Sequence, residues 1–120
     1  MSRHNRILEI TRIVAKSSDC RYKFAASIAY GSRIVSIATN IIKSHPILQT
    51  YGDNCISIHA EVNAILKAED TADATIYVAR YSKDGILDSF PCKYCLAHII
   101  TAQISTIVYN KNGKIELCRL

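Results

Sequence analysis

The sequence lacks an apolar run of about 18 or more residues, so no membrane-spanning helix is expected. Its first segment, MSRHNRILEI, also lacks the continuous apolar stretch of a secretory signal peptide. We therefore expect a cytoplasmic protein without a membrane partner. Its five cysteines would then lie in a reducing compartment, where a Cys-x-x-Cys pair is more often a metal or redox site than a structural disulfide.

Internal repeats, low-complexity tracts and linkers are also absent, and the chain has two prolines, Pro46 and Pro91. A length of 120 residues suits one compact domain and is too short for two, so we expect a single domain over residues 1–120. The composition, 49% apolar and 21% charged, excludes a disordered chain. The net charge of +5 favours anionic partners such as nucleotides or polynucleotides.

The pattern of apolar residues predicts an alternation of helices and strands. Helical spacing predicts helices over residues 3–19, 59–70 and 91–103, with Pro91 at the first helical position of the last one. Runs of β-branched and aromatic residues predict a hairpin around residues 30–33 and strands over 74–81, 105–110 and 115–120. Residues 41–55 show no period and predict a long surface loop.

This order of elements argues for an α/β sandwich around a mixed sheet. Few residues separate Tyr109 from Ile115, and a parallel crossover needs about a dozen. If the last two strands pair, they therefore pair antiparallel. In the middle helix we expect Val62, Ile65 and Leu66 to form the buried face.

Four residues form a candidate catalytic metal site. His59 opens one predicted helix, and Cys92 and Cys95 open the next, so both helix starts can meet at one edge of the sheet. Three such ligands leave the fourth tetrahedral position of zinc open, as in catalytic sites. Zinc lowers the pKa of a water in that position to about 7. Glu61, two residues after His59, can then move that water's proton to a substrate.

Each of these residues has an ordinary interpretation when taken alone. His59 can be a core or helix-start histidine, and Glu61 can be a first-turn acid that complements the helix dipole. Cys92 and Cys95 can be a redox pair or half of a structural zinc site, although the chain has no second Cys-x-x-Cys to complete a Cys₄ site. Together, His-x-Glu followed by Pro-Cys-x-x-Cys is the signature of zinc deaminases.

The segments HAEVNAIL and SFPCKYC resemble the cytidine deaminase superfamily, and within it most closely the deoxycytidylate deaminases. The resemblance implies a three-layer α/β/α sandwich around a five-stranded mixed sheet. It also implies one Zn²⁺ per subunit held by His59, Cys92 and Cys95, with Glu61 as the proton shuttle. Superfamily members are often oligomers, so we expect a homo-oligomer.

The resemblance also predicts substrate contacts. It implies that Asn40 contacts the sugar and that the backbone of Ala60 faces the base. The candidates for lining the base pocket are Phe24, Phe90 and Tyr81, and those for meeting a phosphate are Arg33, Lys43 and His45. Each of the three aromatic residues can equally be core or rim, and His45 can equally belong to an ordinary loop. Asn40 can instead be an asparagine that ends a strand. Free-nucleoside deaminases have an acid where this chain has Ile42, which weakens a free-nucleoside assignment.

These features lead to one preferred function and several alternatives. The preferred function is hydrolytic deamination of a cytosine nucleotide, dCMP to dUMP, with a small-molecule nucleotide as partner. The alternatives are deamination of cytosine or adenine in single-stranded DNA or RNA, deamination of free (deoxy)cytidine, and a non-enzymatic domain with a structural metal. Against a polynucleotide substrate, the sequence offers few aromatic residues for base stacking and no basic tail.

Overall fold

The computed structural model of the protein describes residues 2–42 and 57–120. Lys43 and His45, two of the candidates for a phosphate contact, lie outside the described residues, as does most of the predicted loop over 41–55. In the part of the chain that is described, no helix combines the length and apolar character needed to cross a membrane.

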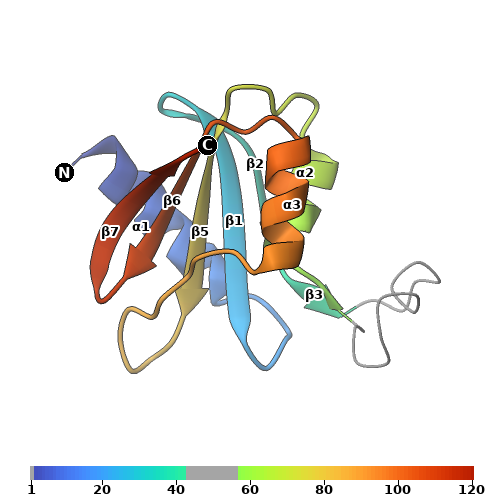
Figure 1. Ribbon diagram of the computed structural model, residues 1–120. Helices are drawn as coiled ribbons and strands as arrows, with labels where there is room; N and C mark the ends of the chain where they lie inside the picture. Colours follow the sequence, from blue (N-terminus) through green and yellow to red (C-terminus); the bar gives the residue numbers. More distant parts are fainter. Residues whose placement is uncertain (1, 43–56) are drawn as a thin grey trace.

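The main sheet has five strands in the order β2-β1-β5-β6-β7, visible edge to edge in Figure 1. Their bounds are Lys23–Tyr30 (β1), Arg33–Thr39 (β2), Thr75–Tyr81 (β5), Thr106–Lys111 (β6) and Lys114–Arg119 (β7). β5 and β6 pair parallel, and the other neighbouring strands pair antiparallel. The sheet is therefore mixed, and the last two strands are antiparallel as their short connection predicts.

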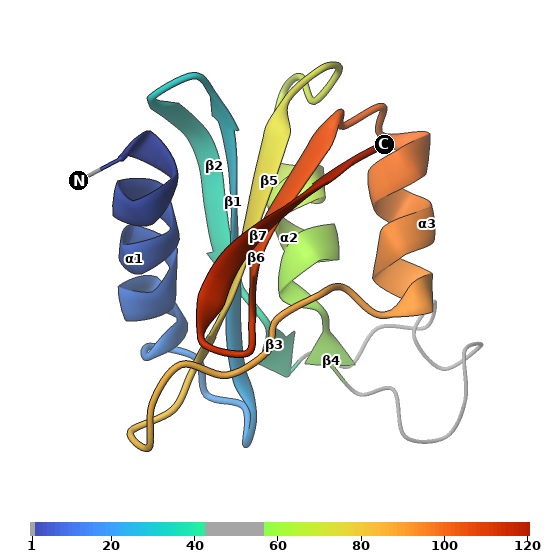
Figure 2. The same ribbon diagram turned by 60° about the vertical axis from the view of Figure 1, so that its left-hand side comes forward.

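Helices cover both faces of this sheet. Helix α1 (Arg3–Ala15) lies on one face, and α2 (Ala60–Lys67) and α3 (Lys93–Thr101) lie on the other, as Figure 2 shows. The predicted three-layer α/β/α sandwich is confirmed. The parallel β5–α3–β6 unit is the crossover that places the start of α3 at the end of β5.

A separate apolar core fills each side of the sheet. Between the sheet and α1, Ile7 and Leu8 pack on Tyr77 and Val108. Between the sheet and α2 and α3, Ala60, Ala64 and Ile99 pack on the opposite faces of β1, β5 and β6. Because successive side chains of a strand alternate between faces, the odd residues of β5 face α1 and the even ones face α2 and α3.

The local structure differs from the sequence prediction in several places, and three of them bear on the site. Ile41–Ile42 (β3) and Ser57–Ile58 (β4) pair as a short antiparallel ladder that the predicted loop did not include. Helix α3 starts at Lys93 with Cys92 as its N-cap, so Pro91 precedes the helix instead of opening it. The third difference is the buried face of α2.

The predicted buried face of α2 is wrong at Leu66, while Ile65 is partly buried and packs against the core. Leu66 is 72% exposed, and the buried residues of the helix are Ala60, Glu61, Asn63 and Ala64. The small side chains of Ala60 and Ala64 let the helix approach the sheet closely. Two hydrogen bonds to β2 fix the orientation of the helix: Ser36 Oγ donates to Ala64 O at 2.7 Å, and Asn63 Nδ2 donates to Thr39 O at 2.9 Å.

Candidate active site

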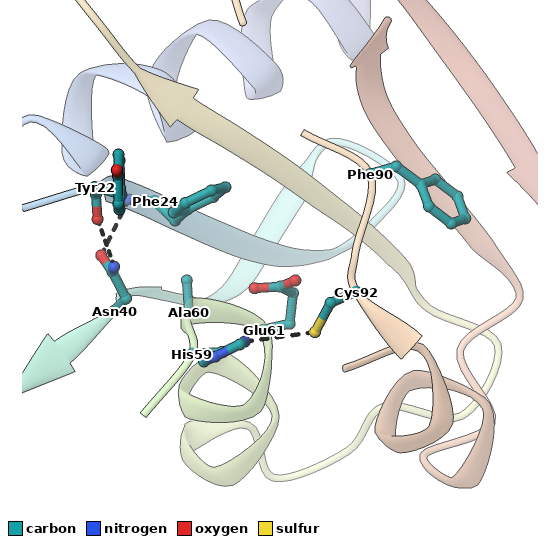
Figure 3. A pocket seen from close by; sticks show the side chains of 8 residues that line it. All are labelled: Tyr22, Phe24, Asn40, His59, Ala60, Glu61, Phe90 and Cys92. Carbon is teal, nitrogen blue, oxygen red and sulfur yellow. Dashed lines mark hydrogen bonds between the residues drawn. The ribbon is translucent and has the colours of Figure 1, made fainter. Parts of the chain in front are cut away.

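The starts of α2 and α3 meet beside the carboxyl end of β5 (Figures 1 and 3). His59 and Cys92 are the N-cap residues of these helices, and both have extended backbone angles. Their carbonyls accept the first helical hydrogen bonds, from Asn63 N at 3.0 Å and Leu96 N at 2.8 Å. Neither side chain caps its own helix. The imidazole of His59 and the thiol of Cys92 instead face each other across the gap between the two helix starts.

Three potential metal donors converge there. His59 Nδ1 lies 3.2 Å from Cys95 Sγ and 3.6 Å from Cys92 Sγ, and the three donor atoms all lie within 4.8 Å of one another. Tetrahedral zinc with Zn–N of about 2.0–2.1 Å and Zn–S of about 2.3 Å separates its nitrogen and sulfur ligands by roughly 3.6 Å. The spacing of the three donors therefore suits one zinc ion.

The surroundings of these donors also fit a divalent cation. Cys95 is fully buried, and burial raises the pKa of its thiol; the negative charge of Glu61 and the Cys92 thiol raise it further. Such a thiol loses its proton when a cation takes the proton's place. Two thiols and a buried carboxylate gather here around a single imidazole, and bound Zn²⁺ would offset their negative charge.

Glu61 is 5% exposed and lies in the first turn of α2, and its side chain lies between those of Ala60 and Cys92 (Figure 3). Burial raises the pKa of this carboxyl, while the hydrogen bond from its own backbone amide and the charge of His59 oppose that rise. A carboxyl that holds a proton more readily than an exposed glutamate is suited to both accepting and donating one near neutral pH.

These side chains form one end of a cavity of about 260 Å³. Tyr22 directly precedes β1, Phe24 is the second residue of that strand, and Phe90 comes from the segment before α3 (Figure 3). The remaining lining residues are Asn40, His59, Ala60, Glu61 and Cys92. The volume and the apolar walls suit a flat ring held above the donor cluster.

Asn40 connects the wall of this cavity to the end of β2. Its Oδ1 accepts hydrogen bonds from Ser18 Oγ at 2.7 Å and Phe24 N at 3.0 Å, and its Nδ2 donates to Tyr22 O at 2.7 Å. These bonds hold Tyr22 and Phe24 in place. One N–H of Nδ2 has no partner among the described residues and can donate to a ligand.

The structure thus brings together most of the residues predicted from the sequence. His59, Cys92 and Cys95 form the donor cluster, and Glu61, Asn40, Ala60, Phe24 and Phe90 line the cavity. Ile42, which stands where free-nucleoside deaminases have an acid, is 59% exposed.

Tyr81 and Arg33 lie elsewhere, which corrects two predictions. Tyr81 is an odd residue of β5, so it faces α1, where Lys16 Nζ lies 5.7 Å from its ring centroid. It lines a separate hollow on that side of the sheet. Arg33 begins β2 and lines another hollow with Tyr30 and Lys67. Neither residue lines the cavity that contains Glu61.

Several residues near the site were not identified from the sequence. Tyr22 lines the cavity, and Arg80 stacks on Tyr22 and Phe24. The ring of Tyr94 packs edge-on against His59, with 6.1 Å between centroids. Ser89 fixes the segment that leads to Cys92. These contacts join residues that are far apart in the sequence. They depend on strand register or on the path of a loop, which the local sequence pattern does not show.

Residues 1–111 match the family model of the cytidine and deoxycytidylate deaminase zinc-binding region. The chain therefore belongs to this family, is a hydrolytic deaminase, and has a donor set that fits one zinc per subunit. The class of reaction is zinc-type deamination of a cytosine compound. A search of curated protein sequences found no significant match.

Solved structures of two such enzymes are similar in fold. Cytidine deaminase from Burkholderia pseudomallei superimposes with a TM-score of 0.71 and 17% identity, covering 99% of this chain and 93% of that one. The dCMP deaminase of cyanophage S-TIM5 in apo form superimposes with a TM-score of 0.65 and 17% identity, covering 87% of this chain and 79% of that one. The structure of the same enzyme in complex with dCMP and dUMP has a TM-score of 0.64 and 18% identity, covering 86% of this chain and 76% of that one.

Proposed function

We propose that the protein converts dCMP to dUMP, with water as co-substrate and ammonia as the second product. The observation that carries the proposal is the convergence of His59 Nδ1 and the two thiols with buried Glu61 in a cavity walled by Phe24 and Phe90. The similar cyanophage enzyme was solved with dCMP and dUMP, which supports a nucleotide as substrate.

The proposed mechanism assigns a separate task to each group. Zinc, held by His59, Cys92 and Cys95, would supply a water acidified enough to act as nucleophile near neutral pH. Glu61 takes a proton from the attacking water and delivers it to the ring nitrogen next to the amino-bearing carbon. A carbon–oxygen bond forms at that carbon. Glu61 then transfers the proton of the added hydroxyl to the amino group, the carbon–nitrogen bond breaks to release ammonia, and the hydroxyl oxygen becomes the carbonyl oxygen of the product.

The cavity walls orient the base. Phe24 lines the cavity beside the base, and an apolar lining of this kind strengthens the interaction between Glu61 and the ring nitrogen. Phe90 also lines the cavity, with its own ring packed edge-on against Tyr109 at 4.8 Å between centroids. Ala60, fully buried between His59 and Glu61, leaves room for the edge of the base. The second N–H of Asn40 Nδ2, which has no partner among the described residues, donates to a sugar hydroxyl.

The test is the loss of ultraviolet absorbance of dCMP, with deoxycytidine measured beside it and the zinc content of the protein determined. Turnover of dCMP with release of stoichiometric ammonia is the expected result. Absence of turnover on both compounds in protein that carries one zinc per chain would overturn the proposal. Preferred turnover of deoxycytidine would restrict the substrate to nucleosides.

We also propose that the protein is a homo-oligomer. Leu66 on α2 and Ile100 on α3 are 72% and 56% exposed, and two helices on the same face of the sheet carry them. Exposed apolar side chains of this kind are typical of a surface that another chain covers. Light scattering coupled to gel filtration measures the mass directly, and a monomer at micromolar concentration would contradict the proposal.

A further inference from the structure

Two arginines stack on the aromatic rim of the cavity. The guanidinium of Arg80 lies 5.2 Å from the ring centroid of Tyr22 and 5.4 Å from that of Phe24. The guanidinium of Arg21 lies 5.4 Å from the ring of Tyr22. Tyr22, which is 54% exposed, and Phe24 both line the cavity. We call Arg21, Tyr22 and Arg80 the arginine rim.

Strand register places Arg80 on the side of the sheet where the cavity lies. Phe24 of β1 pairs with Arg80 of β5, and paired residues of antiparallel strands point to the same face. Arg80 is also an even residue of β5, like Ile76 and Val78, which pack beneath α2 and α3. Its side chain therefore lies on the cavity side of the sheet, against the rings of Tyr22 and Phe24 that line the cavity.

The charge of Arg80 is not neutralised within the described residues. The one ion pair found there joins Arg12 to Glu9 on α1, and neither Arg21 nor Arg80 has a carboxylate partner among these residues. A guanidinium that stacks by its face keeps the N–H groups of its edge available. Stacking on two rings also restricts the side chain before a ligand binds, which lowers the entropic cost of binding.

We propose that Arg80, assisted by Arg21, binds the 5′-phosphate of the cytosine nucleotide whose base occupies the cavity. This inference rests on the proposed function and assigns its specificity for a nucleotide over a nucleoside to the arginine rim. A guanidinium binds a phosphate through two parallel charge-assisted hydrogen bonds. A base held against Phe24 has its sugar near Asn40 and Tyr22, so its phosphate leaves the cavity along the rim.

Binding of the reaction product tests the proposal without requiring turnover. The dissociation constants of dUMP and deoxyuridine are measured by calorimetry on zinc-loaded protein, in the wild type and in Arg80→Gln, Arg80→Lys and Arg119→Gln. We expect dUMP to bind roughly 10- to 100-fold more tightly than deoxyuridine, the range for charge-assisted hydrogen bonds. Arg80→Gln should remove most of that difference and Arg80→Lys part of it. Arg119, exposed at the end of β7, is the matched control and should change nothing.

Two outcomes with Arg80→Gln would overturn the proposal. One is an unchanged dUMP preference in Arg80→Gln. The other is equal weakening of dUMP and deoxyuridine, which would mean that Arg80 only supports the ring of Phe24. A single-stranded oligonucleotide containing deoxyuridine distinguishes the source of the phosphate. If it binds more tightly than dUMP, with steep salt dependence and through Arg80, the free-nucleotide assignment is overturned in favour of a phosphodiester.

The proposed function fails in a different way. If dUMP binds through Arg80 but dCMP is not turned over by zinc-loaded protein, deamination of dCMP is overturned and the phosphate site remains. If dCMP is turned over and Arg80→Gln leaves the dUMP preference intact, the phosphate site is overturned and the reaction remains.

Discussion

Ser89 and Asn110 bind each other through two hydrogen bonds across the edge of the active site. Ser89 N donates to Asn110 O at 3.0 Å, and Asn110 N donates to Ser89 Oγ at 2.9 Å. The same hydroxyl donates to Val78 O at 2.7 Å. The segment before Cys92 is thereby fixed to both β5 and β6, and with it the position of the first thiol.

Replacing Ser89 by alanine should weaken both the fold and the metal site. Ser89 is 1% exposed, and its removal leaves Val78 O and Asn110 N without partners in a buried place. A buried polar group without a partner costs about 1–3 kcal/mol. We expect the free energy of unfolding in urea to fall by that amount and zinc affinity to fall with it. Ser82→Ala, in the exposed turn after β5, is the control. Unchanged zinc affinity would contradict a positioning role.

Glu61→Gln should abolish turnover while preserving the protein. A positioned acid–base group contributes about 10²- to 10⁴-fold to a rate, so kcat should fall by at least that factor. Burial of a neutral amide avoids the cost of desolvating a carboxylate, so thermal stability should be maintained or increased. Zinc content and the rate of dCMP deamination are measured together. The control is Glu116→Gln, an exposed position on β7, which should retain full activity. If zinc-loaded Glu61→Gln also retained full activity, Glu61 would be excluded as the proton shuttle.

The local part of the site could be predicted from the sequence. His59 and Glu61 lie in one turn, and Cys92 and Cys95 lie in another, so each pair is visible within a few letters. The antiparallel pairing of β6 and β7 followed from the short connection between them. In each case the decisive information is confined to a short segment of chain.

The contacts that depend on register could not be predicted in the same way. Arg80 and Tyr81 are neighbours in the chain, yet one reaches the rim of the cavity and the other faces α1. A shift of one residue exchanges the two faces of a strand. Because β5 is buried on both faces, its sequence pattern does not show which residues face α1 and which face the cavity. The buried side of helix α2 was mispredicted for a related reason. The small residues Ala60 and Ala64, together with the hydrogen bonds of the helix to β2, determine which side is buried, and the spacing of the larger apolar residues does not show this.

Removal of the metal should abolish activity without unfolding the sandwich. The apolar cores on the two faces of the sheet are built mainly from residues outside the donor cluster, such as Ile7, Ile76 and Ile107. Treatment with a chelator should therefore leave the far-ultraviolet circular dichroism nearly unchanged, and added Zn²⁺ should restore turnover. Global unfolding on chelation would instead indicate a structural metal site, as in small zinc-dependent folds.

His4 should make stability depend on pH at the opposite side of the sheet. Its Nδ1 lies 2.7 Å from the hydroxyl of fully buried Tyr77, and the neighbouring charges on α1 are Arg3 and Arg6. Burial, and then the charge of Arg3, lower the pKa of His4 below its usual 6.5. Neutral His4 accepts the Tyr77 hydrogen bond, whereas protonated His4 loses that acceptor and is repelled by Arg3.

The sign of the effect follows from the lowered pKa. The unfolded chain binds a proton at His4 more readily than the folded one, so the contribution to stability is complete above pH 6.5 and is lost as the pH falls below it. The urea midpoint of the wild type should decrease from about pH 7 to about pH 5, a range that spans the ordinary histidine pKa of about 6.5. His4→Asn keeps an acceptor for Tyr77 but cannot titrate, so its midpoint should decrease less over the same range. Equal decreases in the two proteins would show that His4 does not contribute to the pH dependence.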